Sequence, residues 1–401
     1  MRTIYSISFI IILSTFWGGC NHSKECFPSE NPASYVVDFE QCMNTERTMR
    51  LSEIADTMEF LELKTPKDTL ITRIWDIFPT DKFLFVFSRD GVFKFTKNGD
   101  YVRKIGRDGQ GPGEYISPGS ADIDYKNQQI VIADGHKVMF FDFDGNLLRE
   151  EKRGYLFEVG CSDSVLWVSE FAHQGCKFIA FALNSKGDTI VSIPNPHYGM
   201  KSKDDGLGGS RARYLKTFYR YKGNLYLKGK EVNDTVYKIS GEKHIPYTIF
   251  NMGKYKLPVE YEAWYSYDDH YKYGKYYWSV ISVGEDDRYQ FLTSLRCAPI
   301  DENRYVHNED NYRYIVYDKE KGEGFVTNGE QGTRIIDDIM GGPAFWPRYV
   351  TDNYYMYTVE WYDLSEELKN GNYNLAPALK EQFKKFGYST NELIVMCRRK
   401  K

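Results

Sequence analysis

The chain has 401 residues, and its 52 lysine and arginine residues against 56 aspartate and glutamate residues give a formal net charge of −4. The basic residues form no stripe, which argues against the basic face that binds nucleic acid. Tyrosine and phenylalanine number 33 and 25, and there are 33 glycines. Aromatic residues favour strands and glycine favours turns, so the composition predicts an all-β protein.

The first 19 residues have the order of a secretory signal. Arg2 supplies a positive start, an apolar run extends over Ile4–Phe16, and Gly18–Gly19 precede Cys20. The run is shorter than the roughly 20 apolar residues of a membrane span. The Gly-Gly-Cys order is typical of a bacterial lipoprotein signal, so we expect Cys20 to carry lipid and anchor the chain in the cell envelope, at the outer membrane rather than the inner. An ordinary secretory signal cut nearby is the alternative.

Residues 20–50 are polar and are expected to form a tether between the lipid and a folded body over 51–401. The other cysteines are too scattered for a zinc site, and no metal or cofactor is predicted. In an exported protein, Cys26 could pair with Cys42 and Cys161 with Cys176. Buried free thiols are the alternative.

A repeat begins after the tether. Four short aromatic or β-branched segments alternate with turn residues, and the turn glycines of the first three units are Gly99, Gly145 and Gly187. They recur about every 45 residues, the spacing of propeller blades. Six such units predict a six-bladed β-propeller. A ring must avoid open sheet edges, so we expect a strand near Phe60 to pair with C-terminal strands near Val395.

The loop after the first unit is the most distinctive part of the chain. It contains three glycines and a proline within a few residues, and it continues into a strand rather than the helix that a dinucleotide-binding loop requires. We therefore expect a rigid structural loop, fixed by polar contacts of its charged members. Its residues are Arg107, Gly109, Gly111, Pro112, Gly113, Glu114 and Tyr115.

Two segments interrupt the repeat. Residues 255–288 are dense in tyrosine and tryptophan, and residues 362–388 contain two short amphipathic patterns that predict helices. Both are expected to be insertions on the rim. Because aromatic rings stack on sugars, Trp264, Tyr265 and Trp278 are candidate ligand-binding residues. Rings that merely cover the propeller body are the alternative.

The sequence resembles a family of six-bladed β-propeller lipoproteins of Bacteroidetes, whose functions are largely unknown. The resemblance rests on Asn98–Gly106 followed by the GQGPGEY string at Gly109–Tyr115, with support from Asp234–Ile239 and Pro246–Gly253. It extends from about Leu51 to the end. It implies a propeller fold and an envelope location, and it supplies no reaction.

No catalytic motif stands out in the sequence. Propeller enzymes use a metal and carboxylates in the central channel, and Asp76, Asp122 and Asp124 are candidate acids, although nothing singles out a set. We therefore expect a membrane-tethered binding protein rather than an enzyme, with a glycan or an envelope protein as ligand and without a nucleic-acid partner. A hydrolase or lyase acting in the channel is the alternative, and the oligomeric state is left open.

Overall fold

The computed structural model describes residues 33–400 except 70, 136, 153–157, 170–175, 200–216, 230–232, 259–272, 298–308, 329–333, 372 and 388–389. The predicted signal, Cys20, Trp264 and Tyr265 therefore lie outside the described residues. The compact unit that begins at Ala33 extends to Lys401.

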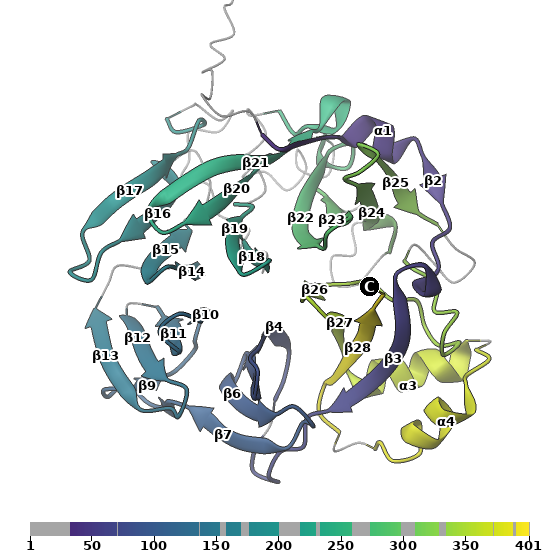
Figure 1. Cartoon of the computed structure of the whole chain (residues 1–401), viewed down its shortest axis with the longest axis horizontal. Helices are drawn as coiled ribbons and strands as arrows, with labels where there is room; N and C mark the ends of the chain where they lie inside the picture. Colours follow the sequence, from purple (N-terminus) through teal and green to yellow (C-terminus); the bar gives the residue numbers. More distant parts are fainter. Residues whose placement is uncertain are drawn as a thin grey trace, which may run out of the picture. The chain divides into compact units, whose positions relative to one another are not determined.

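This unit is a ring of six antiparallel sheets around a central channel (Figure 1). Three blades are formed by consecutive strands. Blade 1 contains β4 (Ile74–Pro79), β5 (Phe83–Ser88), β6 (Gly91–Thr96) and β7 (Tyr101–Ile105). Blade 2 contains β10 (Ser120–Asp124), β11 (Gln129–Asp134), β12 (Lys137–Asp142) and β13 (Leu147–Lys152). Blade 3 contains β14 (Glu158–Ser162), β15 (Val165–Ser169), β16 (Phe178–Leu183) and β17 (Thr189–Pro194).

The other three blades also use strands from the start of the body. Blade 4 contains β18 (Phe218–Tyr221), β19 (Asn224–Leu227), β20 (Thr235–Ser240), β21 (Lys243–Asn251) and β1 (Tyr35–Asp38). Blade 5 contains β22 (Trp278–Glu285), β23 (Tyr289–Arg296), β24 (Tyr312–Asp318), β25 (Glu323–Thr327) and β2 (Glu46–Arg47). Blade 6 contains β26 (Tyr349–Val350), β27 (Tyr354–Val359), β28 (Leu393–Arg399) and β3 (Ala55–Glu62).

The predicted six-bladed propeller is thus confirmed, and so are the turns that suggested it. Gly99, Gly145 and Gly187 have φ angles of 80°, 82° and 87°. Side chains other than glycine are strained in this region, so these positions demand glycine. Between the turns, the central strands are buried on both faces: every residue of β6 except Thr96 is buried. Their aromatic and β-branched side chains fill the spaces between neighbouring blades.

The ring closes as the sequence predicts. Strand β3 pairs antiparallel with β28, and Phe60 lies directly opposite Val395. Phe60 is buried and its ring packs edge-on against Phe383, 5.0 Å between centroids. Because the first and last strands share one sheet, the ring leaves no gap at the point where the chain begins and ends.

The predicted boundary between tether and body is wrong. Residues 35–47, which we call the N-terminal clasp, belong to the body. Strand β1 adds to β21 in parallel, α1 (Phe39–Met43) follows, and β2 adds to β25 in parallel. Phe39 and Cys42 are fully buried. The clasp therefore covers the outer edges of blades 4 and 5, where unpaired backbone groups would otherwise be exposed.

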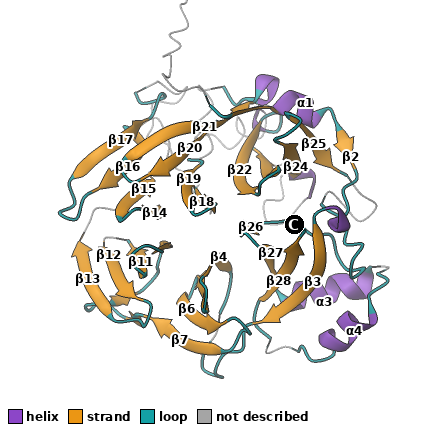
Figure 2. Cartoon of the chain, in the orientation of Figure 1, coloured by secondary structure: helices purple, strands orange, loops and turns teal. Residues whose placement is uncertain are grey.

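Two helices cover blade 6, as predicted for residues 362–388 (Figure 2). They are α3 (Trp361–Asn370) and α4 (Pro377–Phe383), and α4 has proline in its first turn, where the missing N–H costs nothing. Leu364 and Leu379 are fully buried in the core of this blade. Short 3₁₀ turns lie at η1 (Leu51–Glu53), η2 (Gly253–Tyr255) and η4 (Glu309–Asn311).

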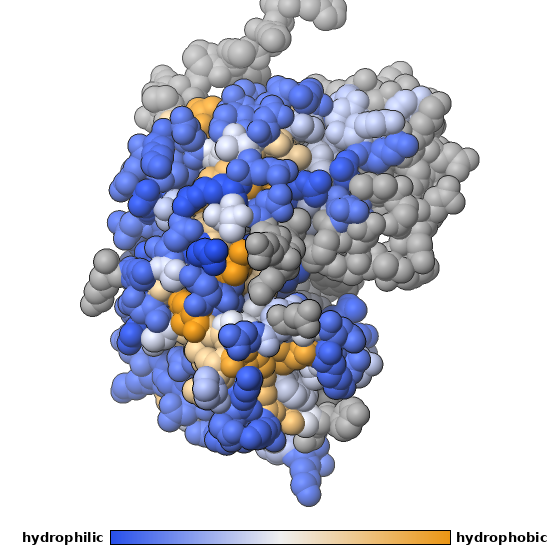
Figure 3. Space-filling model, turned by 90° about the vertical axis from the view of Figure 1, so that its right-hand side faces the viewer, coloured by the Kyte–Doolittle hydropathy of each residue, from blue (hydrophilic) through white to orange (hydrophobic). Residues whose placement is uncertain are grey.

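The side of the ring that carries these helices and the clasp is largely hydrophilic. Figure 3 shows small hydrophobic areas separated by polar side chains on this face. The cysteines in the described part of the chain form no disulfide: Cys42, Cys161, Cys176, Cys297 and Cys397. The proposed disulfide between Cys161 and Cys176 is therefore absent, and Cys42 is also unbridged.

Candidate ligand-binding site in the central channel

The innermost strands of the six blades enclose a cavity of about 330 Å³ on the axis of the ring. This volume lies at the lower end of the range of ligand pockets, about 300–1,000 Å³. Residues from β4, β10, β14, β18, β22 and β26 line the cavity. All six blades therefore contribute to one concave site.

Aromatic side chains form much of the wall. They come from blades 1, 2, 4 and 6 and comprise Trp75, Phe78, Phe87, Tyr125, Phe218, Tyr219, Tyr221 and Tyr349. Most are buried by packing between blades, and the Tyr349 hydroxyl donates to the Trp75 carbonyl at 3.0 Å. Tyr125 differs, because 40% of it is exposed although it lines a cavity.

An ion pair between blades 2 and 4 spans the cavity wall. Arg220 Nη2 donates to Asp122 Oδ2 at 2.7 Å, and also to the carbonyls of Ile123 and Cys161 at 3.0 and 2.9 Å. Asp122 Oδ2 also accepts from the Cys161 N–H at 2.6 Å. Burial raises the pKa of the Asp122 carboxyl, and the Arg220 guanidinium opposes that shift. The pair links the inner strands of blades 2, 3 and 4.

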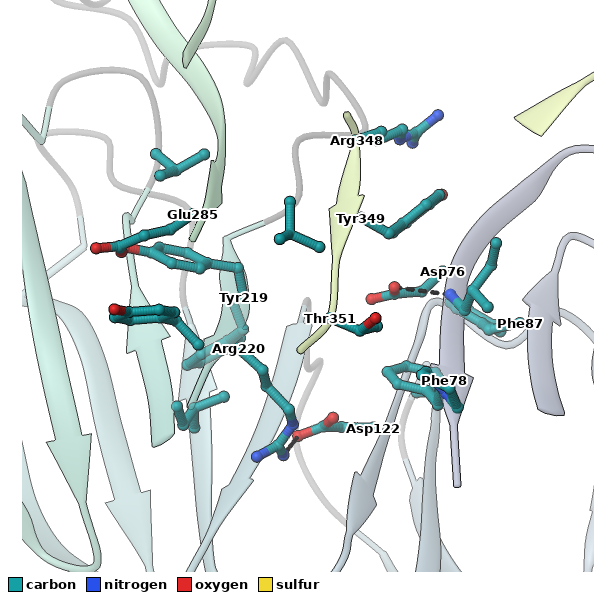
Figure 4. Close-up of a pocket in the computed structure, with 18 of the residues that line it drawn as sticks. Asp76, Phe78, Phe87, Asp122, Tyr219, Arg220, Glu285, Arg348, Tyr349 and Thr351 are labelled. Carbon is teal, nitrogen blue, oxygen red and sulfur yellow. Dashed lines mark hydrogen bonds and ion pairs between the residues drawn. The ribbon is translucent and has the colours of Figure 1, made fainter. Parts of the chain in front are cut away.

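Asp76 faces the same space from blade 1 (Figure 4). Its Oδ1 accepts from the Ile77 N–H at 2.8 Å. Asp76 and Asp122 occupy corresponding positions in β4 and β10, where a channel-facing residue follows Trp75 or Ala121. The channel thus contains two of the three acids that the sequence offered as candidates. The third, Asp124, instead accepts from the Lys126 and Asn127 N–H groups in the turn after β10.

Glu285 illustrates a lining residue with a structural role. Its side chain is fully buried and accepts from the Tyr219 and Tyr247 hydroxyls at 3.0 and 2.6 Å, and from Lys319 Nζ at 2.7 Å. Figure 4 shows its carboxylate turned away from the cavity. Three donors compensate the burial of this charge, so Glu285 holds blades 4 and 5 together.

A second polar network lies around Asp287. Asp287 pairs with Lys222 at 2.6 Å, accepts from the Tyr221 hydroxyl at 2.9 Å and lies 3.8 Å from Arg399. The hydrogen bonds from Lys222 and Tyr221 lower the pKa of the Asp287 carboxyl. Lys222 and Arg399 also line the cavity, so this network joins blades 4, 5 and 6 beside it.

The described residues hold no group of three or more His, Cys, Asp or Glu side chains arranged to bind a metal ion. None of the described helices has the length and apolar character of a membrane span.

Residues 34–398 match the family described as "Domain of unknown function (DUF4934)". The chain belongs to this family. The matched region includes the clasp, the six blades and the cavity. No curated protein matches the sequence significantly.

One solved structure of low sequence identity shares the fold of this family member, and two others are less similar. A putative exported protein from Bacteroides fragilis is 18% identical, with a TM-score of 0.66 over 91% of this chain and 100% of that one. The extracellular domain of a putative hybrid two-component system from B. thetaiotaomicron is 10% identical, with a TM-score of 0.37 over 67% of this chain and 29% of that one. The Neurospora crassa Pan2 WD40 domain is 8% identical, with a TM-score of 0.37 over 70% and 77%.

The glycine-rich loop makes the kind of contacts expected of a structural element. Arg107–Asp108 (β8) pair in parallel with Glu114–Tyr115 (β9), and Glu114 accepts from the Gly111 N–H at 2.9 Å. The Tyr115 hydroxyl is fully buried and donates to the Ile105 carbonyl at 2.7 Å. Arg107 contributes through its main-chain N–H, which donates to the Gly113 carbonyl. The loop lies outside the cavity lining.

The loop is also tied to blade 2. Lys137 Nζ donates to the Gly111 carbonyl at 3.1 Å, and the Gly113 N–H donates to Glu150 at 3.0 Å. Gly109 and Gly113 have φ angles of 144° and 70°, which explains the need for glycine there. Pro112 is exposed.

The predicted binding role of Trp278 is wrong. Trp278 is the first residue of β22, only 3% exposed, and Arg296 lies over its ring at 4.4 Å. The predicted insertion over 255–288 therefore contains the whole inner strand of blade 5. A tryptophan buried in a blade cannot offer its face to a sugar.

Proposed function

We propose that the protein is an extracytoplasmic binding protein that holds a small ligand in the central cavity of its propeller. One observation carries the proposal: a cavity of about 330 Å³ is lined by all six blades and combines aromatic walls with Asp76, Asp122 and Arg220. Ligand sites are concave and mostly apolar, with a few placed polar groups. This combination suits a small polar molecule with an apolar face.

The location follows from the sequence. The export signal and the Gly-Gly-Cys order before Cys20 support secretion and a lipid anchor, and the exported B. fragilis protein has the same fold. We propose that Cys20 tethers the protein to a membrane of the cell envelope, and we favour the outer membrane over the inner one. Metabolic labelling with a fatty acid should mark the wild type and miss Cys20→Ala.

Two ligand classes, a glycan and an envelope protein, follow from the sequence. A concave site of about 330 Å³ has room for one or two sugar rings and is too small for a folded protein, so we favour the glycan. Binding without catalysis is proposed because two channel carboxylates, Asp122 and Glu158, are engaged in links between blades.

The test is a ligand screen by thermal shift, because a ligand that binds the folded state raises its stability. Val350 is half-buried and lines the cavity, so Val350→Trp should fill part of it and abolish the shift. Leu148→Trp is the matched control on the outer strand β13, where the residue is 48% exposed. The proposal fails if no small molecule stabilises the protein, or if binding survives Val350→Trp.

A further inference from the structure

We infer that the central cavity recognises a neutral, polyhydroxylated sugar ring, stacked on Tyr125 and hydrogen-bonded by Asp76 and the Asp122–Arg220 pair. The inference rests on the proposed function, because it names the ligand class of the same cavity.

Tyr125 is the first element of the argument. Large aromatic residues inside this protein are mostly buried, yet Tyr125 is 40% exposed and lines the cavity. Part of its surface is therefore available to a ligand in the cavity. The guanidinium carbon of Arg220 lies 5.2 Å from the centre of its ring, so the phenol is held from one side. An aromatic face fixed in this way offers a platform to the apolar C–H face of a sugar ring.

The polar groups around Tyr125 supply both donors and acceptors. The three hydrogen bonds that Arg220 makes with Asp122, Ile123 and Cys161 all leave from Nη2. The guanidinium carries five N–H donors, so donor capacity remains at its other nitrogens. Each carboxylate has about four acceptor sites, so Asp76 and Asp122 can accept further bonds. Adjacent sugar hydroxyls both donate and accept, which matches this mixture.

The balance of charge selects a neutral ligand. Asp122 and Arg220 already compensate one another, so neither presents a net charge. The rest of the wall also mixes both signs. Its acids are Asp76, Asp122, Glu158, Glu285 and Asp352, and its bases are Arg220, Lys222, Arg348 and Arg399. Outside this pair, an anionic ligand would meet Asp76 and a cationic ligand would meet Arg348. A neutral ligand avoids both repulsions.

Figure 4 shows how these groups converge. Asp76 and Phe78 approach the space from blade 1, Arg220 approaches it from blade 4, and Asp122 meets Arg220 at the bottom of the view. Because the Nη2 bonds fix Arg220 to blades 2 and 3, its guanidinium is held in place before a ligand enters. A site fixed in advance loses less conformational entropy on binding.

The first test compares the binding of sugars that have a similar shape but a different charge. The protein is titrated calorimetrically with the methyl glycosides of glucose, galactose and mannose, and with the corresponding uronates and 2-amino sugars. We expect at least one neutral glycoside to bind, at least tenfold more tightly than its uronate and its amine. Equal or tighter binding of a charged analogue would overturn the inference, and so would a lack of binding by all the neutral glycosides.

The second test removes the platform. We expect Tyr125→Ala to weaken binding of the neutral glycoside at least tenfold, and Tyr125→Phe to stay within threefold of the wild type. Tyr198→Ala is the matched control, since Tyr198 is 55% exposed and does not line the cavity. Near-ultraviolet circular dichroism checks that each variant is folded. Unchanged binding by folded Tyr125→Ala overturns the inference.

The outcomes also separate this inference from the proposed function. If a molecule that is not a sugar stabilises the protein and Val350→Trp abolishes that effect, the cavity is a binding site and the sugar assignment is wrong. If Val350→Trp changes the binding of no compound, both fail.

Discussion

Described strands or helices cover blades 4, 5 and 6 on their outer side, whereas no described strand pairs with the outer edges of blades 2 and 3. The clasp pairs with β21 and β25, and α3 and α4 pack over blade 6. Among the described strands, none pairs with the outer edge of β13 or β17. Strand β13 includes Arg149, Glu150 and Glu151, and such charges discourage edge-to-edge association. Strand β17 has no charged residue and ends in Pro194, which limits further pairing.

The half of the ring formed by blades 1–3 and the half formed by blades 4–6 also differ in how far apart their paired strands lie in the sequence. Blades 1–3 form from consecutive strands between residues 74 and 194. Blades 4–6 each add a strand from residues 35–62. Completing blades 4–6 therefore has the larger cost in loop-closure entropy. Only the buried area and the hydrogen bonds formed where β1, β2 and β3 join their sheets can offset that cost. We expect the covered half to be more sensitive to changes at the two ends of the body.

The largest effect is expected from removing the end of the chain. Deletion of residues 391–401 removes β28, the strand between β27 and β3. Val395, Ile394 and Cys397 are fully buried there, so the ring loses both its closure and part of its core. We expect loss of the cooperative thermal transition, measured by calorimetry. A truncated protein that melts like the full chain would show that β3 and β28 are not needed for closure.

The next effect is expected in the clasp. Phe39→Ala removes a fully buried ring that packs edge-on against Tyr255, 5.8 Å between centroids. Loss of a buried phenylalanine costs about 3–5 kcal/mol of unfolding free energy. Urea denaturation measures this change, and Val36→Ala, at a residue that is 56% exposed in the same segment, is the control. Equal effects of the two variants would mean that the clasp adds little to stability.

A smaller effect is expected at the loop that braces blades 1 and 2. Tyr115→Phe removes a buried hydroxyl that donates to the Ile105 carbonyl and accepts from the Val92 N–H at 3.3 Å. Leaving buried polar groups unpaired costs about 1–3 kcal/mol. We expect urea denaturation to show this loss, with sugar binding unchanged. Lost binding at unchanged stability would instead make the loop part of a ligand site.

The smallest effect concerns pH at the boundary between the two halves. His244 is the second residue of β21 and lies beside the β20–β21 turn of blade 4. Its ring packs against the ring of Trp167 in blade 3, with 6.0 Å between the centroids. Burial lowers the pKa of His244, so below about pH 6.5 the unfolded chain binds more protons than the folded one. The unfolding free energy should therefore fall as the pH drops from 7.5 to 5.5.

His244→Gln should reduce this fall, measured by urea denaturation at both pH values. His197→Gln is the control, at a residue outside the blades. The interpretation would be wrong if both variants retained the full dependence on pH.

Much of the fold could be predicted because the repeat is local. Turn glycines such as Gly99 and Gly145 are required by backbone geometry, so their spacing revealed the blades. The pairing of Phe60 with Val395 followed from the need to close a ring. The clasp could not be predicted in this way. Strand β1 is four residues long and pairs in parallel with a distant strand, so neither length nor pattern distinguishes it from a polar linker.

The site was harder to predict because the type of a residue does not indicate which way its side chain points. Trp278 and Tyr125 are both aromatic, yet one is buried in a blade and the other faces the cavity. Asp76 and Asp122 were identified as candidate acids, but the sequence could not separate them from Asp124, which lies two positions further along the same strand as Asp122. Arg220 was missed entirely, because its partner Asp122 belongs to another blade.

The pairing of β3 with β28 also sets the order in which the protein can be made. Blade 6 cannot be completed until β28 has left the ribosome, because its outer strand β3 lies near the start of the body and pairs with β28. Throughout synthesis the chain is an open arc with an unpaired strand rather than a closed ring. Under the export proposed above, the ring can close only after β28 has crossed the membrane to reach β3.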